Sequence, residues 1–132
     1  MALLIDTSVL VDLERARSPA LLQEIEDQGV FISAISASEL LHGVERAADD
    51  ARRARRQAFV ERVLDIVPIL PFDLDVARVH ARTWAGLLQR GAAIGAHDLI
   101  IAATALCHDL AVLTRNAREF GRVDGLELRT FE

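Results

Sequence analysis

The sequence of 132 residues contains no lysine, and all 15 of its basic residues are arginine. Mechanisms that need a Schiff-base lysine, or the phosphate-binding lysine of a P-loop, are therefore excluded. The sequence also has a single cysteine, Cys107, so an intramolecular disulfide cannot form. A lone thiol in an apolar helical segment is compatible with a reducing compartment.

Long apolar runs and an excess of positive charge are also missing. No apolar segment approaches the about 20 residues that span a bilayer, and the first residues lack the basic region of a signal peptide. We therefore expect a cytoplasmic protein that makes no membrane contact. The net charge of −5 argues against sequence-independent binding to nucleic acid, although it leaves room for a local basic groove.

Short apolar runs alternate with amphipathic segments along the chain. The predicted strands are residues 3–5, 30–33, 66–70, 111–114 and 126–131. Pro68 and Pro71 limit the third of them to a short or edge strand. The predicted helices cover residues 9–13, 18–28, 36–44, 73–89 and 97–106, with a long arginine-rich helix between the third and the fourth. This alternation predicts a single α/β domain, residues 1–132, with a mainly parallel sheet of four to five strands.

Three carboxylates stand at comparable points of this pattern. Asp6 follows the first predicted strand, Glu39 comes shortly after the second, and Asp98 lies in the first turn of an almost entirely apolar helix. Asn116 follows the strand at residues 111–114. Because the carboxyl ends of parallel strands meet at one edge of a sheet, these four side chains can converge there.

Each acid also has a purely structural explanation. Asp6 can cap the first helix, residues 36–39 fit a capping box, and Asp98 favours the helix dipole. A cap contributes about 1 kcal/mol. Two carboxylates about 4 Å apart repel by about 4 kcal/mol at an effective dielectric of about 20. A cluster of three acids therefore needs a cation or a raised pKa, and oxygen ligands without nearby cysteine indicate Mg²⁺ or Mn²⁺.

Four segments, in this order, resemble the PIN domain family and, more narrowly, the VapC toxins of VapBC toxin–antitoxin modules. The segments are LIDTS at 4–8, ISASELLHG at 35–43, HDLIIAA at 97–103, and LTRN at 113–116 followed by Phe120. Any one of these segments is a weak signal, whereas the ordered set is specific.

The resemblance implies a metal-dependent ribonuclease on a three-layer α/β/α sandwich, usually dimeric and inhibited by a cognate antitoxin. Position by position, Asp6, Glu39 and Asp98 match the acidic site residues of the family, and they are the implied ligands of Mg²⁺ or Mn²⁺. The fourth acidic position falls on Asn116, where this chain departs from the family. An asparagine can ligate a metal through its amide oxygen but brings no charge, and whether Glu119 replaces the missing acid is left open.

Two other protein classes have an acidic site comparable to Asp6. A phosphatase of the haloacid-dehalogenase type needs a second aspartate where this chain has Ser8, and a receiver domain needs an acidic cluster; both also need a lysine. The stronger alternative is a PIN-like domain that only binds RNA or protein, with catalysis weakened or lost through Asn116. Trp84 and the leucines of its helix are expected in the core or on a surface for self-association.

Overall fold

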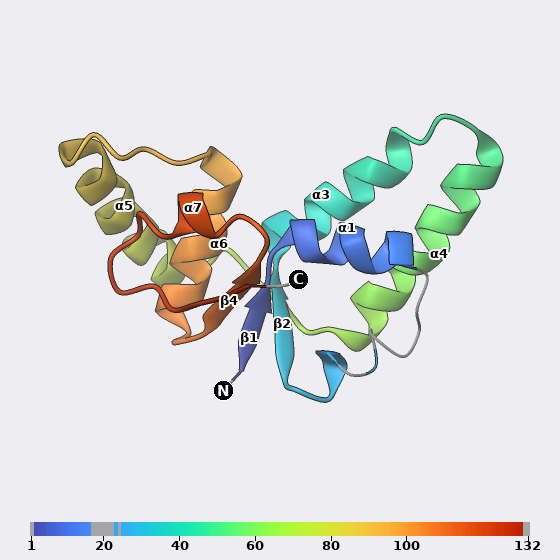
Figure 1. The fold of residues 1–132 in the computed structure, drawn as a ribbon, viewed down its shortest axis with the longest axis horizontal. Helices are drawn as coiled ribbons and strands as arrows, with labels where there is room; N and C mark the ends of the chain where they lie inside the picture. Colours follow the sequence, from blue (N-terminus) through green and yellow to red (C-terminus); the bar gives the residue numbers. More distant parts are fainter. Residues whose placement is uncertain (1, 17–22, 24, 131–132) are drawn as a thin grey trace.

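The computed structural model describes residues 2–16, 23 and 25–130. Five strands form one parallel sheet in the order β3-β2-β1-β4-β5 (Figure 1). The strands are β1 (Leu3–Ile5), β2 (Val30–Ser33), β3 (Ile69–Leu70), β4 (Ala111–Thr114) and β5 (Leu128–Thr130). The predicted parallel sheet is therefore confirmed, and β3 is a short edge strand, as the two flanking prolines require.

Helices cover both faces of this sheet. One face carries α1 (Thr7–Ala16), α3 (Ala34–Glu45) and α4 (Asp50–Ile66), and the other carries α5 (Leu74–Gln89), α6 (Ala96–Cys107) and α7 (Ala117–Phe120). Leu3 and Ile5 of β1 pack into the first core, whereas Leu4 packs into the second. Because both faces of β1 are buried, the strand is apolar throughout. The three-layer α/β/α architecture is thus confirmed.

Several helix boundaries differ from the predicted ones. Helix α3 begins at Ala34 because Ser33 is its N-cap, and the Ser33 hydroxyl accepts a hydrogen bond from the backbone N–H of Ser36 at 3.2 Å. The predicted capping box over residues 36–39 is therefore wrong. The helix predicted at 18–28 lies largely outside the described residues. Gly29, the residue after it, has a positive φ of 73°, a conformation that is common just past the end of a helix.

Helices α3 and α4 pack against each other as a helical hairpin, which extends away from the sheet in Figure 1. The Arg56 guanidinium of α4 donates to the Gly43 carbonyl at 2.8 Å and lies 3.4 Å from the Glu14 carboxylate of α1. These contacts join the two helices of the hairpin to each other and to α1. None of the described helices is long and apolar enough to cross a membrane.

The sheet register brings the ends of β1 and β4 side by side. Leu4 is the partner of Val112, and Ile5 is the partner of Leu113. The backbone N–H of Asp6 then donates to the Leu113 carbonyl at 2.9 Å, which extends the pairing by one residue. The first polar side chains after both strands therefore emerge at the same edge of the sheet.

Candidate active site

Asp6 is buried where β1 ends, with a relative exposure of 5%. Its Oδ2 accepts hydrogen bonds from the hydroxyl groups of Ser8 and Thr114, each at 2.8 Å. Both donors are side chains, so the hydrogen bonds of this carboxylate do not cap α1 within the described part of the chain. Hydroxyl donors on α1 and β4 instead hold the carboxylate at the sheet edge.

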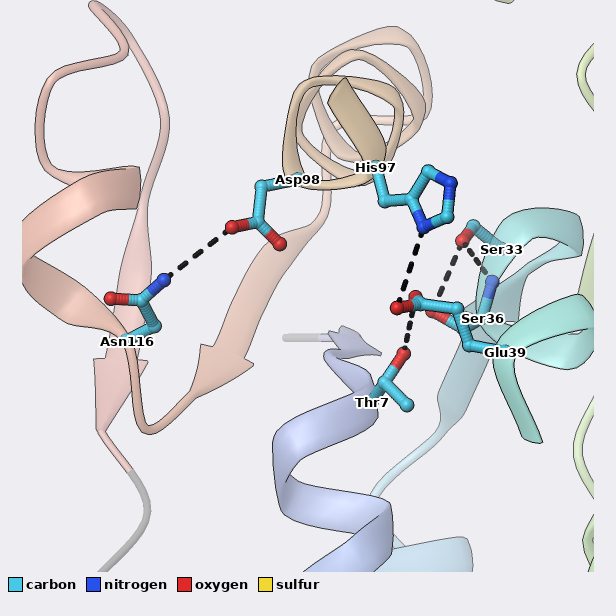
Figure 2. A network of polar contacts seen from close by, with 7 residues as sticks. All are labelled: Thr7, Ser33, Ser36, Glu39, His97, Asp98 and Asn116. Carbon is cyan, nitrogen blue, oxygen red and sulfur yellow. Dashed lines mark hydrogen bonds and ion pairs between the residues drawn. The ribbon is translucent and has the colours of Figure 1, made fainter. Parts of the chain in front are cut away.

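Glu39 lies on α3, and its carboxylate contacts residues of two other helices. Its Oε1 accepts a hydrogen bond from the Thr7 hydroxyl at 2.9 Å, and its Oε2 lies 3.5 Å from Nδ1 of His97 (Figure 2). Thr7 belongs to α1 and His97 to α6. Three helices that are distant in sequence therefore meet at the Glu39 carboxylate.

Asp98 follows His97 in the first turn of α6 but faces the opposite side of the site in Figure 2. Its pKa is raised to about 7, first by burial and then by the negative charges of Asp6 and Glu119, with Glu39 adding a smaller effect. Charges act on one another this strongly only when they are close. The three acids predicted from the sequence thus share one electrostatic environment.

Asn116 and Glu119 complete the site on the side of α7. The Asn116 amide nitrogen donates to Asp98 Oδ2 at 3.4 Å and to Glu119 Oε2 at 3.0 Å. Glu119 Oε1 also accepts from the backbone N–H of Gly95. The hydrogen bond from the Gly95 N–H lowers the pKa of Glu119 most, and the hydrogen bond from the Asn116 amide lowers it further. Glu119 therefore stays ionised while it joins the start of α6 to the segment after β4.

Two contributors are not singled out by the sequence pattern. Thr114 ends a buried strand, and its hydroxyl both donates to Asp6 and accepts from the backbone N–H of Asn116 at 2.8 Å. At Gly95, an added Cβ would lie 3.4 Å from Glu119 Oε1 and 3.7 Å from Asp98 Oδ2. Thr114 stands in the LTRN segment that carries part of the resemblance, but the segment alone assigned it no role, and Gly95 was not named as a site residue.

The donors at this edge have the chemistry that a hard divalent cation prefers. Carboxylate oxygens predominate, and a cation would offset the negative charge that raises the pKa of Asp98. As the side chains stand, no group of three His, Cys, Asp or Glu residues in the described ranges could hold a metal ion. Glu39 is engaged through both oxygens by Thr7 and His97. The carboxylate oxygens are thus the kind of ligand that Mg²⁺ or Mn²⁺ prefers, but these side chains must rotate before they can surround one ion.

Known proteins share both the sequence pattern and the fold. The PIN domain model matches residues 3–126. Ribonuclease VapC1 of Rickettsia felis is 38% identical over 130 residues, covering 98% of this chain and 96% of that protein. VapBC-5 from Mycobacterium tuberculosis matches with a TM-score of 0.76 at 33% identity, over 99% and 98% of the two chains. DNA-bound VapBC from Salmonella typhimurium matches with a TM-score of 0.88 at 25% identity, over 98% of both chains. The chain therefore belongs to the PIN domain family and, within it, to the VapC ribonucleases.

Proposed function

We propose that this VapC-family ribonuclease hydrolyses RNA phosphodiester bonds with Mg²⁺ or Mn²⁺ bound among Asp6, Asp98 and Glu39. The observation that carries the proposal is the meeting of these acids at one edge of the sheet, where the ends of β1 and β4 lie side by side. Burial first, and then the charges of Asp6, Glu119 and Glu39, raise the pKa of Asp98 there to about 7. The names of relatives support the reaction class, since they include Ribonuclease VapC1 of Rickettsia felis and the tRNA(fMet)-specific endonuclease VapC of Salmonella typhimurium.

Asp6 and Asp98 are assigned to hold the metal ion. Both hydrogen bonds of Asp6 within the described residues fall on Oδ2, which leaves Oδ1 for a ligand. A bound divalent ion supplies an activated water and offsets charge on the scissile phosphate. Glu39, held by Thr7 and His97, is assigned to support the ion or its water. Asn116 restrains the Asp98 carboxylate through its amide group without adding charge.

We further propose that a cognate antitoxin protein inhibits this chain in the cytoplasm and that the chain acts as a homodimer. The antitoxin is supported by VapBC-5 from Mycobacterium tuberculosis, which is a member of a family of toxin–antitoxin systems. An antitoxin that covers the acidic edge would block access of RNA to Asp6 and Asp98. Adding the purified antitoxin to the ribonuclease assay should therefore abolish cleavage.

The proposal is tested by RNA cleavage with freshly purified, antitoxin-free protein in Mg²⁺ or Mn²⁺. Wild type should cleave RNA, EDTA should stop cleavage, and Asp6→Asn should be inactive. Glu61→Gln is the matched control, because it removes an exposed carboxylate on α4. Equal rates for wild type and Asp6→Asn would refute the assignment of the site, and full activity in EDTA would refute the metal requirement.

A binding-only domain is the second candidate, and the neutral Asn116 at the fourth acidic position favours it. The absence of a preformed group of three metal-binding side chains in the described ranges points the same way. RNA binding measured by fluorescence anisotropy separates the two functions. Tight binding without cleavage, unchanged by Asn116→Asp, would establish the binding domain. Cleavage that appears or increases in Asn116→Asp would favour the nuclease.

A further inference from the structure

The arginines of the chain are concentrated on the hairpin of α3 and α4. Six of the 15 lie between residues 46 and 62, where three acids, Asp49, Asp50 and Glu61, offset them only in part. Elsewhere on the described chain, several arginines form ion pairs with carboxylates: Arg90 with Asp124, Arg115 with Asp12, and Arg129 with Glu127. The hairpin is therefore a local basic region on a chain whose net charge is −5.

Two of the six hairpin residues have a structural role. The Arg53 guanidinium donates to the Glu45 carbonyl at 3.3 Å, and Arg56 donates to the Gly43 carbonyl at 2.8 Å. Both contacts join α4 to the end of α3. Packing of the hairpin thus accounts for Arg53 and Arg56, but it leaves four arginines to explain.

These four are Arg46, Arg52, Arg55 and Arg62, which we call the hairpin arginines, and all are exposed. Arg52 lies 3.6 Å from Asp49, but the two side chains are 62% and 56% exposed, so this ion pair contributes little. Within the described ranges, the other three hairpin arginines form no ion pair. Their positive charge can therefore act on an anionic partner.

The charges of α4 are separated by helix side. Arg52, Arg55 and Arg62 follow one another at intervals of three and seven residues, which places them on one side of the helix. The acids of α4 are centred roughly a third of a turn away, at Asp50, Glu61 and Asp65. Like charges three residues apart, such as Arg52 and Arg55, repel each other and weaken a helix. An anion bound outside the chain would offset that repulsion.

The side of the hairpin with these arginines adjoins the edge of α3 that carries Glu39. Gly43, which accepts from Arg56, comes one turn after Glu39 on α3, and Arg52 comes one turn before Arg56 on α4. Arg46 ends α3 seven residues after Glu39, on the same side of that helix and about 10 Å further along its axis. In Figure 1 both helices of the hairpin extend together away from the sheet. A polymer that enters the site at Glu39 can therefore continue along the hairpin arginines.

We propose that the hairpin arginines bind the phosphates of RNA on one side of the scissile bond, an inference that rests on the proposed ribonuclease activity. The carboxylates of the candidate site repel a polyanion, so positive charge outside the site must hold the substrate. Arginine suits this role because its planar guanidinium binds phosphate through two parallel hydrogen bonds. RNA carries a phosphate at every nucleotide, whereas a protein partner would need an acid at each matching position, so the charges favour RNA.

Contacts of this kind hold RNA without reading its sequence, because they are made to the backbone. The hairpin arginines should therefore lower the KM of a long RNA, whereas a short oligonucleotide that spans only the acidic site should gain nothing from them. A role confined to folding of the hairpin would affect both substrates equally. The length of the RNA thus separates binding from a merely structural role.

A matched pair of double variants tests the proposal. Arg55→Gln with Arg62→Gln removes two hairpin arginines, and Arg78→Gln with Arg82→Gln removes two exposed arginines of α5, which lies on the opposite side of the molecule in Figure 1. Fluorescence anisotropy of a labelled single-stranded RNA, in EDTA to prevent cleavage, measures binding. The hairpin variant should bind at least about tenfold more weakly at about 50 mM salt, and its slope of log affinity against log salt should fall by about 1.4, since each phosphate contact on a single strand contributes about 0.7. The α5 variant should bind like wild type.

Equal affinity of the two double variants, or no RNA binding by folded wild type, would overturn the proposal. A hairpin variant that binds RNA like wild type but no longer binds the antitoxin would show that this side of the hairpin binds protein instead. In cleavage assays with Mg²⁺, the hairpin variant should show a KM for the long RNA raised at least about tenfold, with kcat within about twofold of wild type. Binding that depends on these arginines without any cleavage would reject the ribonuclease and keep the RNA surface, whereas cleavage at an unchanged KM would do the reverse.

Discussion

Asp6 and Asp98 are the same residue type at the same edge of the sheet, yet their surroundings differ. Asp6 is 5% exposed and receives two hydroxyl hydrogen bonds of 2.8 Å. Asp98 receives an amide hydrogen bond of 3.4 Å, and burial and neighbouring carboxylates raise its pKa to about 7. The comparison shows that one carboxylate can be held in place by neutral donors while its neighbour keeps a repulsion that only a proton or a cation removes.

Catalysis should show the largest effect. Asp98→Asn should lower the rate of RNA cleavage at least about 100-fold, because the variant loses a charged ligand for the ion that stabilises the transition state. The fold should survive, since asparagine has the same shape and removes like-charge repulsion. Initial rates on a fluorogenic RNA, with circular dichroism to check folding, measure both. A folded Asp98→Asn with the wild-type rate would show that Asp98 lies outside the reacting centre.

The next effect concerns the donors that hold Asp6. Thr114→Val removes the hydroxyl that links Asp6 to the backbone of Asn116, and it should lower the free energy of unfolding by about 2 kcal/mol. Thr104→Val is a matched control, because Thr104 is equally buried but its hydroxyl donates only to the Ile100 carbonyl of its own helix. Urea denaturation compares the two. Equal losses would mean that the link to Asp6 contributes nothing beyond a local hydrogen bond.

A smaller effect should appear in the pH dependence of stability. Because the pKa of Asp98 is raised above its unfolded value of 3.8, the folded protein binds the extra proton, and this stabilisation is lost as pH rises towards 7. Asp98→Asn has no carboxyl group to deprotonate at this position, so its stability should not fall in this way. At pH 8 the variant should therefore be more stable than wild type by about 1 kcal/mol, after allowance for solvent screening. Thermal unfolding from pH 4 to pH 8 without divalent ions measures the difference. A constant difference across this range would contradict the raised pKa.

The smallest effect should follow from loosening Glu39. Thr7→Val removes a partly buried hydrogen bond of 2.9 Å and should cost about 0.5 kcal/mol of stability, with a few-fold loss of cleavage rate. Thr7→Ser keeps the hydroxyl and should restore both. If Thr7→Ser behaves like Thr7→Val, the methyl group rather than the hydrogen bond positions Glu39.

Periodicity and turn residues were sufficient to predict most of the architecture. The apolar runs that became β1 and β4, and the prolines that confine β3 to the edge, are local signals. The start of α3 was not predicted, because Ser33 and Ser36 can each begin a helix and only the structure distinguishes them. Once Ser33 is the N-cap, Glu39 is too far along α3 to close a capping box.

The acids of the candidate site could be named from the sequence, but their partners could not. The hydroxyl of Thr114 reaches Asp6 across 108 positions of the chain, and that of Thr7 reaches Glu39 across 32. Such pairs depend on sheet order and register, which local patterns do not determine. Their metal-binding and catalytic roles remain predictions, as does the homodimer.

Calorimetric titration of Mn²⁺ into antitoxin-free protein at pH 8 addresses the pairing of Asp6 with Asp98 directly. Wild type should bind Mn²⁺, whereas Asp6→Asn and Asp98→Asn should each bind at least about tenfold more weakly, with the exposed-site control Glu61→Gln unchanged. Equal affinity and equal heat for wild type and Asp98→Asn, or no binding by folded wild type, would contradict a metal site between these two carboxylates.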